Sequence, residues 1–359
     1  MIKAFFYRLL IMGGIDEMRQ NFSGGGKFGL VSAIATLLPS LICLLVPLES
    51  TAQYPSTNLQ TSKTSPKSGI ECPDTTSSSP KTNKGTNQII SRFDPQNIAR
   101  QLLHCYLEKR AIDHIRLQFT PEQADQIQAA LIQQLIPHLG QPIGYKAGLT
   151  NPLAQEKFNV TQPILGTLLE KMLLKSGATI TANFGAIPMF EADLIVKVGS
   201  DDISQAKTPE EILSHLEAVI PFLELPDLQY SPEVQLNASL LTIINVGARL
   251  GVVGEAIPLN QIDNWQTRLS QIQVTIYDET GGRLASGNSK DLLGDPLNVV
   301  FWIKNQLDKQ GKALKKGDLL SLGTITPLTP AKAGESIRAE YIGLMDKPVE
   351  ITVNFVEKD

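Results

Sequence analysis

The order of hydrophobic and polar residues changes character along the chain, from a helical repeat to a strand repeat. In residues 93–110, FDPQNIARQLLHCYLEKR, apolar side chains recur every three or four positions after an Asp–Pro start, as in a capped amphipathic helix. Residues 120–139 repeat this device, with Thr120 as the N-cap and Gln123 where it completes a capping box. The first part of the domain is therefore predicted to be helical.

From about residue 144 onward, the pattern is that of short strands separated by turns. Residues 190–198, FEADLIVKV, alternate at first and then become almost wholly apolar. Residues 219–225, VIPFLEL, form an apolar run around one glutamate, and residues 294–311 have the pattern of a later helix. Helices followed mainly by strands predict an α+β fold with a mixed, strand-rich core.

An uncharged, apolar stretch lies near the N-terminus. No charged residue occurs between Lys27 and Glu49, and the small residues Ser50 and Ala52 follow at plausible cleavage positions. This pattern is typical of a secretory signal, and it is also long enough to span a bilayer, which needs about 20 apolar residues. We therefore expect residues 1–52 to be a signal peptide or membrane anchor, and the domain to be exported or membrane-anchored. If the start site is misassigned, the protein would be cytoplasmic.

The next segment has the composition of a linker. Residues 53–88 are rich in Ser, Thr, Pro, Lys and Asn and offer few apolar side chains to bury, which predicts a disordered tether. The folded domain is predicted to occupy residues 89–359. Of the three cysteines, only Cys105 falls in that range, so the domain is predicted to have no internal disulfide.

Composition and charge exclude one class of partner. The chain of 359 residues is 42% hydrophobic and carries a net charge of −4, with a pI near 5.7. This acidic balance argues against electrostatic binding of nucleic acid. Membrane contact is expected only through the N-terminal segment, if that segment is not cleaved.

Two acids share one face of the strand predicted at residues 190–198. Glu191 and Asp193 are two positions apart, so their side chains project to the same side. Adjacent carboxylates at the start of a buried strand repel each other unless a positive group lies between them, and such oxygen ligands suit Mg²⁺ or Mn²⁺. Glu224, inside an apolar run, is a third acid that would need a partner. A divalent-metal site is one interpretation, and a solvated strand end is the other.

Six segments occur in the order found in a known enzyme family. They are GYKAGLTN (144–151), LLEKM (168–172), FEADLIVKV (190–198), VIPFLEL (219–225), LASG (284–287) and GDLLSLGTITPLTPAKAGESIRAEYIGLMD (317–346). Together they resemble the 2-keto-4-pentenoate hydratases, which belong to the fumarylacetoacetate hydrolase superfamily. The GYKxGLT form favours the hydratase and decarboxylase branch over the hydrolases. The resemblance, over about residues 94–355, implies a barrel-like, strand-rich core with flanking helices, and a homo-oligomer.

The resemblance also implies site residues. The metal ligands of the family fall on Glu191, Asp193 and Glu224, the second being Asp where the family has Glu. The motif lysine falls on Lys146, and the final hydroxyl on the substrate side falls on Thr324. The implied cofactor is a divalent cation, Mg²⁺ or Mn²⁺.

The implied activity is that of a metal-dependent hydro-lyase of aromatic catabolism. It would add water to a 2-hydroxy-2,4-dienoate or 2-oxo-4-enoate, a small 2-oxo acid, to give a 4-hydroxy-2-oxo acid. Lys146 would bind the substrate carboxylate or transfer a proton. The residue before the motif methionine, commonly Asp in the family, is Lys171 here, and lysine replaces a carboxylate in proton transfer only if its pKa is strongly lowered. Two alternatives stay open: a 2-oxo-acid decarboxylase of the same superfamily, and an exported, catalytically inactive binding module.

Overall fold

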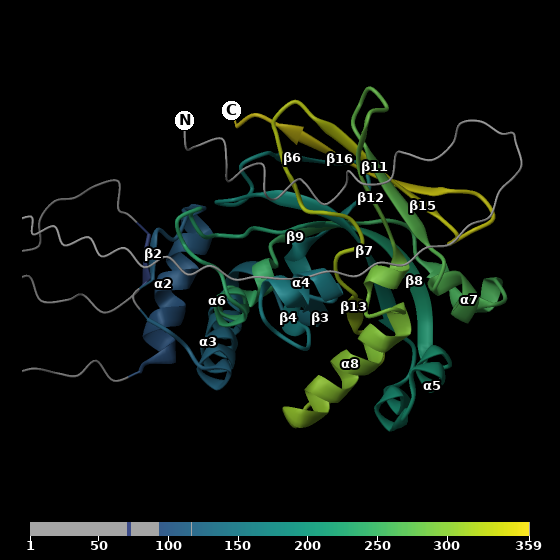
Figure 1. Cartoon of the computed structure of the whole chain (residues 1–359), viewed down its shortest axis with the longest axis horizontal. Helices are drawn as coiled ribbons and strands as arrows, with labels where there is room; N and C mark the ends of the chain where they lie inside the picture. The colour runs from purple at the N-terminus through teal and green to yellow at the C-terminus, as the bar shows by residue number, and fades with distance from the viewer. Residues whose placement is uncertain (1–69, 73–92, 116, 359) are drawn as a thin grey trace, which may run out of the picture. The chain divides into compact units, whose positions relative to one another are not determined.

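The computed structural model describes residues 70–72, 93–115 and 117–358 (Figure 1). The predicted signal or anchor, residues 1–52, lies outside these described residues. Within the described part of the chain, no helix is both long and apolar enough to cross a membrane.

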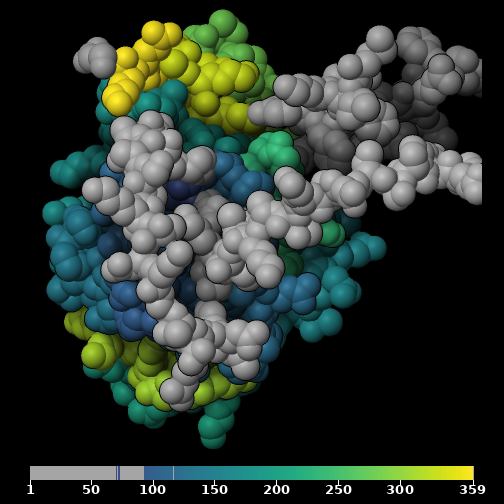
Figure 2. All heavy atoms as spheres, turned by 90° about the vertical axis from the view of Figure 1, so that its left-hand side faces the viewer, coloured from purple at the N-terminus to yellow at the C-terminus, as the bar shows by residue number. Residues whose placement is uncertain are grey.

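The helices predicted near the start of the domain are present. Asp94 caps the first helix by accepting hydrogen bonds from two backbone N–H groups, and Thr120 and Gln123 form the expected capping box on the second. The helices are α2 (Pro95–Glu108), α3 (Pro121–Leu139), α4 (Pro152–Lys157), α5 (Pro209–Leu213), α6 (Ala238–Ile243), α7 (Trp265–Leu269) and α8 (Pro296–Lys309). The first two, α2 and α3, pack on each other. Together with the short helix α6 they form a layer with its own apolar core. Figure 2 shows parts of the helical layer, in blue, with atoms of the C-terminal region, in yellow, above them.

A nine-stranded sheet forms the centre of the domain. Its main path is β4-β3-β13-β7-β8-β9-β5, with both parallel and antiparallel pairs. The strands on this path are β4 (Ile164–Leu169), β3 (Pro142–Gly148), β13 (Leu319–Ser321), β7 (Met189–Val198), β8 (Leu216–Leu225), β9 (Leu250–Val253) and β5 (Leu173–Lys175); β10 (Ile257–Pro258) pairs with β8, and β14 (Thr329–Pro330) with β7. Strand β7 is buried along nearly its whole length, which explains its continuous apolar run.

A second sheet of five strands packs on one face of the first. Its order is β12 (Arg283–Asn288), β11 (Gln273–Tyr277), β15 (Ser336–Ile342), β16 (Val349–Val356) and β6 (Ala178–Thr181). Apolar side chains from both sheets share one core with α8, and Leu194 and Val353 are among those that are fully buried. The predicted α+β class, with a mixed, strand-rich, half-barrel core and flanking helices, is confirmed (Figure 1).

Two predictions about the N-terminal side of the domain are corrected. Strand β1 (Ile70–Glu71) pairs with β2 (His114–Ile115), and Cys72 forms a disulfide with Cys105 of α2. Residues 70–72, predicted to be part of a disordered linker, are therefore attached to the domain. The prediction of no internal disulfide was wrong because it assumed that a cysteine before residue 89 lies outside the fold.

Candidate active site

The three predicted acids lie on two neighbouring strands. Glu191 of β7 is directly opposite Glu224 of β8 in the antiparallel register, and Asp193 is opposite Phe222. Their alternation along β7 places both acids of that strand on one face, as their spacing predicts. All three are buried, with exposed fractions of 4% for Glu191, 2% for Glu224 and 0% for Asp193.

Lys146 supplies the positive charge beside this pair of glutamates. It lies on β3, is 4% exposed, and its Nζ forms an ion pair with Glu224 Oε1. Nζ also donates a hydrogen bond of 2.8 Å to the backbone oxygen of Val246. A buried lysine held by a carboxylate and a carbonyl is fixed in direction and kept from water, which suits it to act on a bound substrate.

An unusual turn presents that carbonyl to Lys146. Asn245 and Val246 both have left-handed backbone conformations, with φ of 55° and 57°, and a β-branched residue rarely adopts this region. Asn245 stabilises the turn because its side chain accepts from Thr167 N and donates to Thr167 O, each at 2.8 Å. Gly148 of β3 faces this turn, and it must be glycine because a larger side chain there would clash with the side chain of Val246.

Thr324 is the predicted hydroxyl residue beside Glu191, so the structure brings it close to the carboxylate pair. Burial raises the pKa of the Glu191 carboxyl well above its usual value, and the adjacent Glu224 raises it further. Lys146 and the Thr324 side chain partly oppose this rise in pKa.

The glutamate pair has the features of a cation site. Among the described residues, neither Glu191 Oε2 nor Glu224 Oε2 has a hydrogen-bond partner, although both atoms are buried. Unpartnered, buried carboxylate oxygens are costly unless a cation or donor satisfies them. A divalent cation prefers such hard oxygen ligands, so these two residues fit one.

Asp193 has different partners from the two glutamates. Its Oδ1 accepts from Leu194 N, Leu322 N and Gly323 N, at 2.5, 3.2 and 2.8 Å, and its Oδ2 accepts from the Ser321 hydroxyl. Burial and, next, Glu224 raise the pKa of Asp193 well above its usual value. Across the described residues, no three His, Cys, Asp or Glu side chains are arranged to hold a metal ion. The arrangement thus differs from the predicted set of three ligands.

Sequence reasoning missed two buried polar residues, Asn245 and Thr150. Asn245, which sets the turn described above, has no local motif that marks it. Thr150 lies in the GYKAGLT segment next to Gly323, is 1% exposed, and its hydroxyl has no hydrogen-bond partner among the described residues. The motif that identified Lys146 could have pointed to Thr150 as well.

The segment with the departure from the family does not contribute to the site. Lys171 is exposed and donates to the backbone oxygen of His138 at 3.2 Å. Its exposed neighbour Glu170 accepts from Gln141 N at 3.1 Å. Neither side chain joins the glutamate pair, so this segment supplies no acid or base to it.

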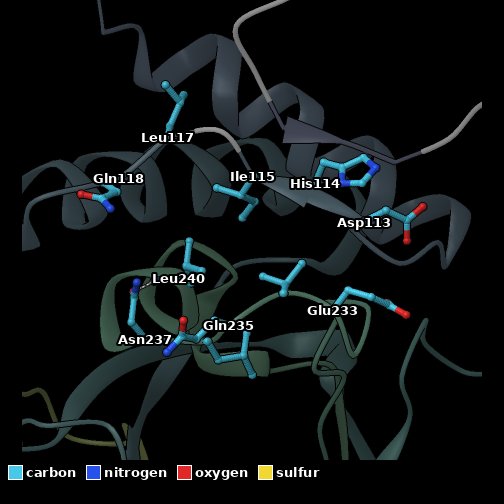
Figure 3. Close-up of a pocket in the computed structure, with 11 residues that line it drawn as sticks. Asp113, His114, Ile115, Leu117, Gln118, Glu233, Gln235, Asn237 and Leu240 are labelled. Atoms are coloured by element: carbon cyan, nitrogen blue, oxygen red, sulfur yellow. Dashed lines mark hydrogen bonds between the residues drawn. The ribbon is translucent and has the colours of Figure 1, made fainter. Parts of the chain in front are cut away.

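The structure also has a cavity away from the glutamate pair (Figure 3). Its volume is about 650 Å³, and it lies between residues 113–115 and 117–118 on one side and residues 233–237 and Leu240 on the other. Ile115, Leu117 and Leu240 contribute apolar walls, while none of the predicted site residues lines it.

Comparison with known proteins gives hydratases as sequence relatives. No known family profile matches the chain. The 2-oxo-hept-4-ene-1,7-dioate hydratase of Escherichia coli is 27% identical over 254 residues, which is 68% of this chain and 92% of that protein. The 2-keto-4-pentenoate hydratase of Paraburkholderia xenovorans is 25% identical over 233 residues, covering 65% of this chain and 84% of the relative.

Among solved structures, the 4-oxalocrotonate decarboxylase from Pseudomonas putida G7, complexed with magnesium and adipate, has a TM-score of 0.66 at 20% identity. The match covers 75% of this chain and 100% of the decarboxylase, and at this identity it establishes the fold. The chain is therefore similar in sequence to 2-keto-4-pentenoate hydratases and has the fold of the 4-oxalocrotonate decarboxylase.

Proposed function

We propose that the protein is a metal-dependent hydro-lyase that adds water to a 2-hydroxy-2,4-dienoate or 2-oxo-4-enoate to give a 4-hydroxy-2-oxo acid. The observation that carries this proposal is the buried Glu191–Glu224 pair, with an unpartnered oxygen on each side chain, beside Lys146 and Thr324. The names of the sequence relatives, which are hydratases, support the reaction class.

The proposed cofactor is a divalent cation, Mg²⁺ or Mn²⁺. Glu191 and Glu224 would hold it through their Oε2 atoms. Two structures of the decarboxylase with the same fold contain magnesium or calcium, which supports this class of ion. When bound, such a cation supplies Lewis acidity toward the oxygens of a 2-oxo acid and offsets the repulsion between the two carboxylates.

The chain's own residues would bind and orient the substrate. Lys146 would bind the substrate carboxylate, or move a proton to or from the substrate, from the position that Glu224 and the Val246 carbonyl give it. The Thr324 hydroxyl, beside Glu191, would also contact the substrate. The burial of these groups excludes water except where it is a reactant, and this strengthens each charged contact.

The proposal extends to the setting of the enzyme. Export or membrane anchoring through residues 1–52 is supported by the Cys72–Cys105 disulfide, because disulfides persist mainly in oxidising compartments. A homo-oligomer and a role in aromatic catabolism are also part of the proposal, and they rest on the family resemblance.

The reaction can be tested with the full-length chain. With Mg²⁺ or Mn²⁺ present, we expect the protein to cause a loss of the ultraviolet absorbance of 2-hydroxypenta-2,4-dienoate. With a chelator present, we expect no such loss of absorbance. Formation of a hydroxylated 2-oxo acid would support the hydratase, whereas release of CO₂ from a 2-oxo diacid would establish the decarboxylase alternative. If several 2-hydroxydienoates show no metal-dependent loss, the proposal fails in favour of an inactive binding module.

A further inference from the structure

Asp193 is a buried carboxylate whose two oxygens both accept hydrogen bonds. Oδ1 accepts from Leu194 N, Leu322 N and Gly323 N, and Oδ2 accepts from the Ser321 hydroxyl. Each carboxylate oxygen offers about two lone pairs, so Oδ1 is fully used and Oδ2 keeps at most one lone pair for another ligand. The two glutamates contrast with this, because each keeps one buried oxygen without a partner among the described residues.

Three of the four donors to Asp193 form one short segment of chain. Ser321 ends β13, and Leu322 and Gly323 follow it directly. Gly323 has a φ of 104°, a conformation that an L side chain rarely adopts, so the chain bends sharply here. The next residue is Thr324, whose side chain lies beside Glu191. Asp193 thus fixes the turn from which Thr324 extends.

Asp193 also lies at a well-anchored point of β7. Its backbone oxygen accepts from the Tyr341 hydroxyl at 3.0 Å, and the same hydroxyl donates to Phe222 O at 2.6 Å. This places β7, β8 and β15 in one network with the turn after β13. Networks of buried, satisfied polar groups hold their members in a single arrangement.

We infer that Asp193 is a positioning residue that holds the Ser321–Gly323 turn, and with it the Thr324 hydroxyl, and that it is not a ligand of the cation. This inference rests on the proposed function for the roles of the cation and of Thr324. The shorter side chain is central to it, since Asp193 replaces the glutamate that the family resemblance implies at this position.

Two substitutions at this position separate a positioning role from a ligand role. Asp193→Asn keeps an acceptor for the backbone N–H groups and can donate to Ser321, but it removes the charge. Asp193→Glu keeps the charge and restores the family's ligand type, but it forces an extra methylene into a site that is 0% exposed. A positioning role predicts that Asn is tolerated and Glu is not, and a ligand role predicts the reverse order.

The test measures calorimetric Mn²⁺ affinity and thermal unfolding of the full-length variants, with Glu191→Gln as a control. We expect Asp193→Asn to bind Mn²⁺ within about fivefold of wild type and to unfold at a similar temperature, because only a neighbouring charge is lost. Glu191→Gln should lose about a hundredfold in affinity. An Asp193→Asn loss as large as that of Glu191→Gln would overturn the inference while leaving the proposed cation site intact.

A kinetic readout separates positioning from general stabilisation. Ser321→Ala removes one donor to Asp193, and we expect it to raise KM severalfold with Mn²⁺ affinity unchanged. Adding Ser321→Ala to Thr324→Val should give little further rise in KM, because Ser321 acts through the hydroxyl that Thr324→Val has already removed. Independent, multiplying effects would contradict the inference. If wild type binds no Mn²⁺, the proposed function fails, and the order of the Asn and Glu unfolding temperatures still tests the role of Asp193.

Discussion

The glutamate pair on β7 and β8 and the cavity near β2 are opposite kinds of site. The pair is fully enclosed, and its ionisable groups are at most 4% exposed. The cavity is hollow, about 650 Å³, but its His114 and Glu233 side chains are exposed to water (Figure 3). A charge in water costs little, whereas a buried carboxylate without a partner is costly and needs a reason. In this protein, the burial of ionisable groups is therefore a better indicator of the proposed catalytic site than the volume of a cavity.

The largest effect is expected from removing the positive charge of Lys146, which lies beside the glutamate pair. Lys146→Met leaves Glu224 buried without its ion-pair partner, next to Glu191. Without added metal, we expect the free energy of unfolding to fall by about 3 kcal/mol, and turnover to fall at least about a hundredfold. Chemical denaturation with and without Mg²⁺ measures this, and Mg²⁺ should restore part of the lost stability. If the variant is as stable as wild type in the presence of a chelator, the claim that the buried glutamates need a positive partner is contradicted.

A smaller effect is expected at Asn245, which does not contact the charged groups but holds the turn that binds Lys146. Asn245→Ala removes both hydrogen bonds to Thr167 that hold the Val246 carbonyl toward Lys146. We expect a loss of about 1 to 3 kcal/mol in the free energy of unfolding and about a tenfold loss of turnover. Asn245→Asp keeps the acceptor but places a buried carboxylate against the Thr167 carbonyl, so it should destabilise the protein at least as much as Asn245→Ala. Equal turnover in all three proteins would contradict a role for this turn.

The disulfide should affect stability without affecting chemistry. Cys72→Ser removes the link between β1 and α2, which joins residues 33 positions apart. We expect the free energy of unfolding to fall by about 2 kcal/mol, near the low end for disulfides, because the β1 segment can detach alone. Turnover should stay unchanged, since the bond lies in the helical layer. Loss of metal-dependent turnover in this variant would show that the two regions are coupled.

The smallest effect is expected in the cavity. Glu233→Gln changes an exposed side chain at its rim, so stability should change by no more than about 0.5 kcal/mol, and turnover should not change. Steady-state kinetics under the conditions used for Lys146→Met provide the comparison. A clear loss of turnover would place the chemistry in the cavity.

Local patterns were sufficient to predict much of the fold. The caps at Asp94 and Thr120 follow from contacts within three residues, and the shared face of Glu191 and Asp193 follows from strand alternation. The family resemblance then identified Lys146, which pairs with Glu224 across strands that are far apart in sequence.

The features that could not be predicted depend on contacts between distant parts of the chain. Lys146 bonds the carbonyl of a residue 100 positions away, and Ser321 bonds Asp193 across 128 positions. Cys72 lies in a segment whose composition indicates a linker, and only its pairing with Cys105 attaches it to the domain. Composition and periodicity carry no information on such pairings.

The most direct measurement of the central claim is a calorimetric titration of Mn²⁺ into wild type, Glu191→Gln and Glu233→Gln. Both variants remove one carboxylate charge, one from the buried pair and one from the cavity. We predict one site per chain in wild type, about a hundredfold weaker binding in Glu191→Gln, and unchanged binding in Glu233→Gln. Binding by Glu191→Gln that equals wild type, or loss of binding in Glu233→Gln alone, would contradict the assignment of the cation site to the glutamate pair.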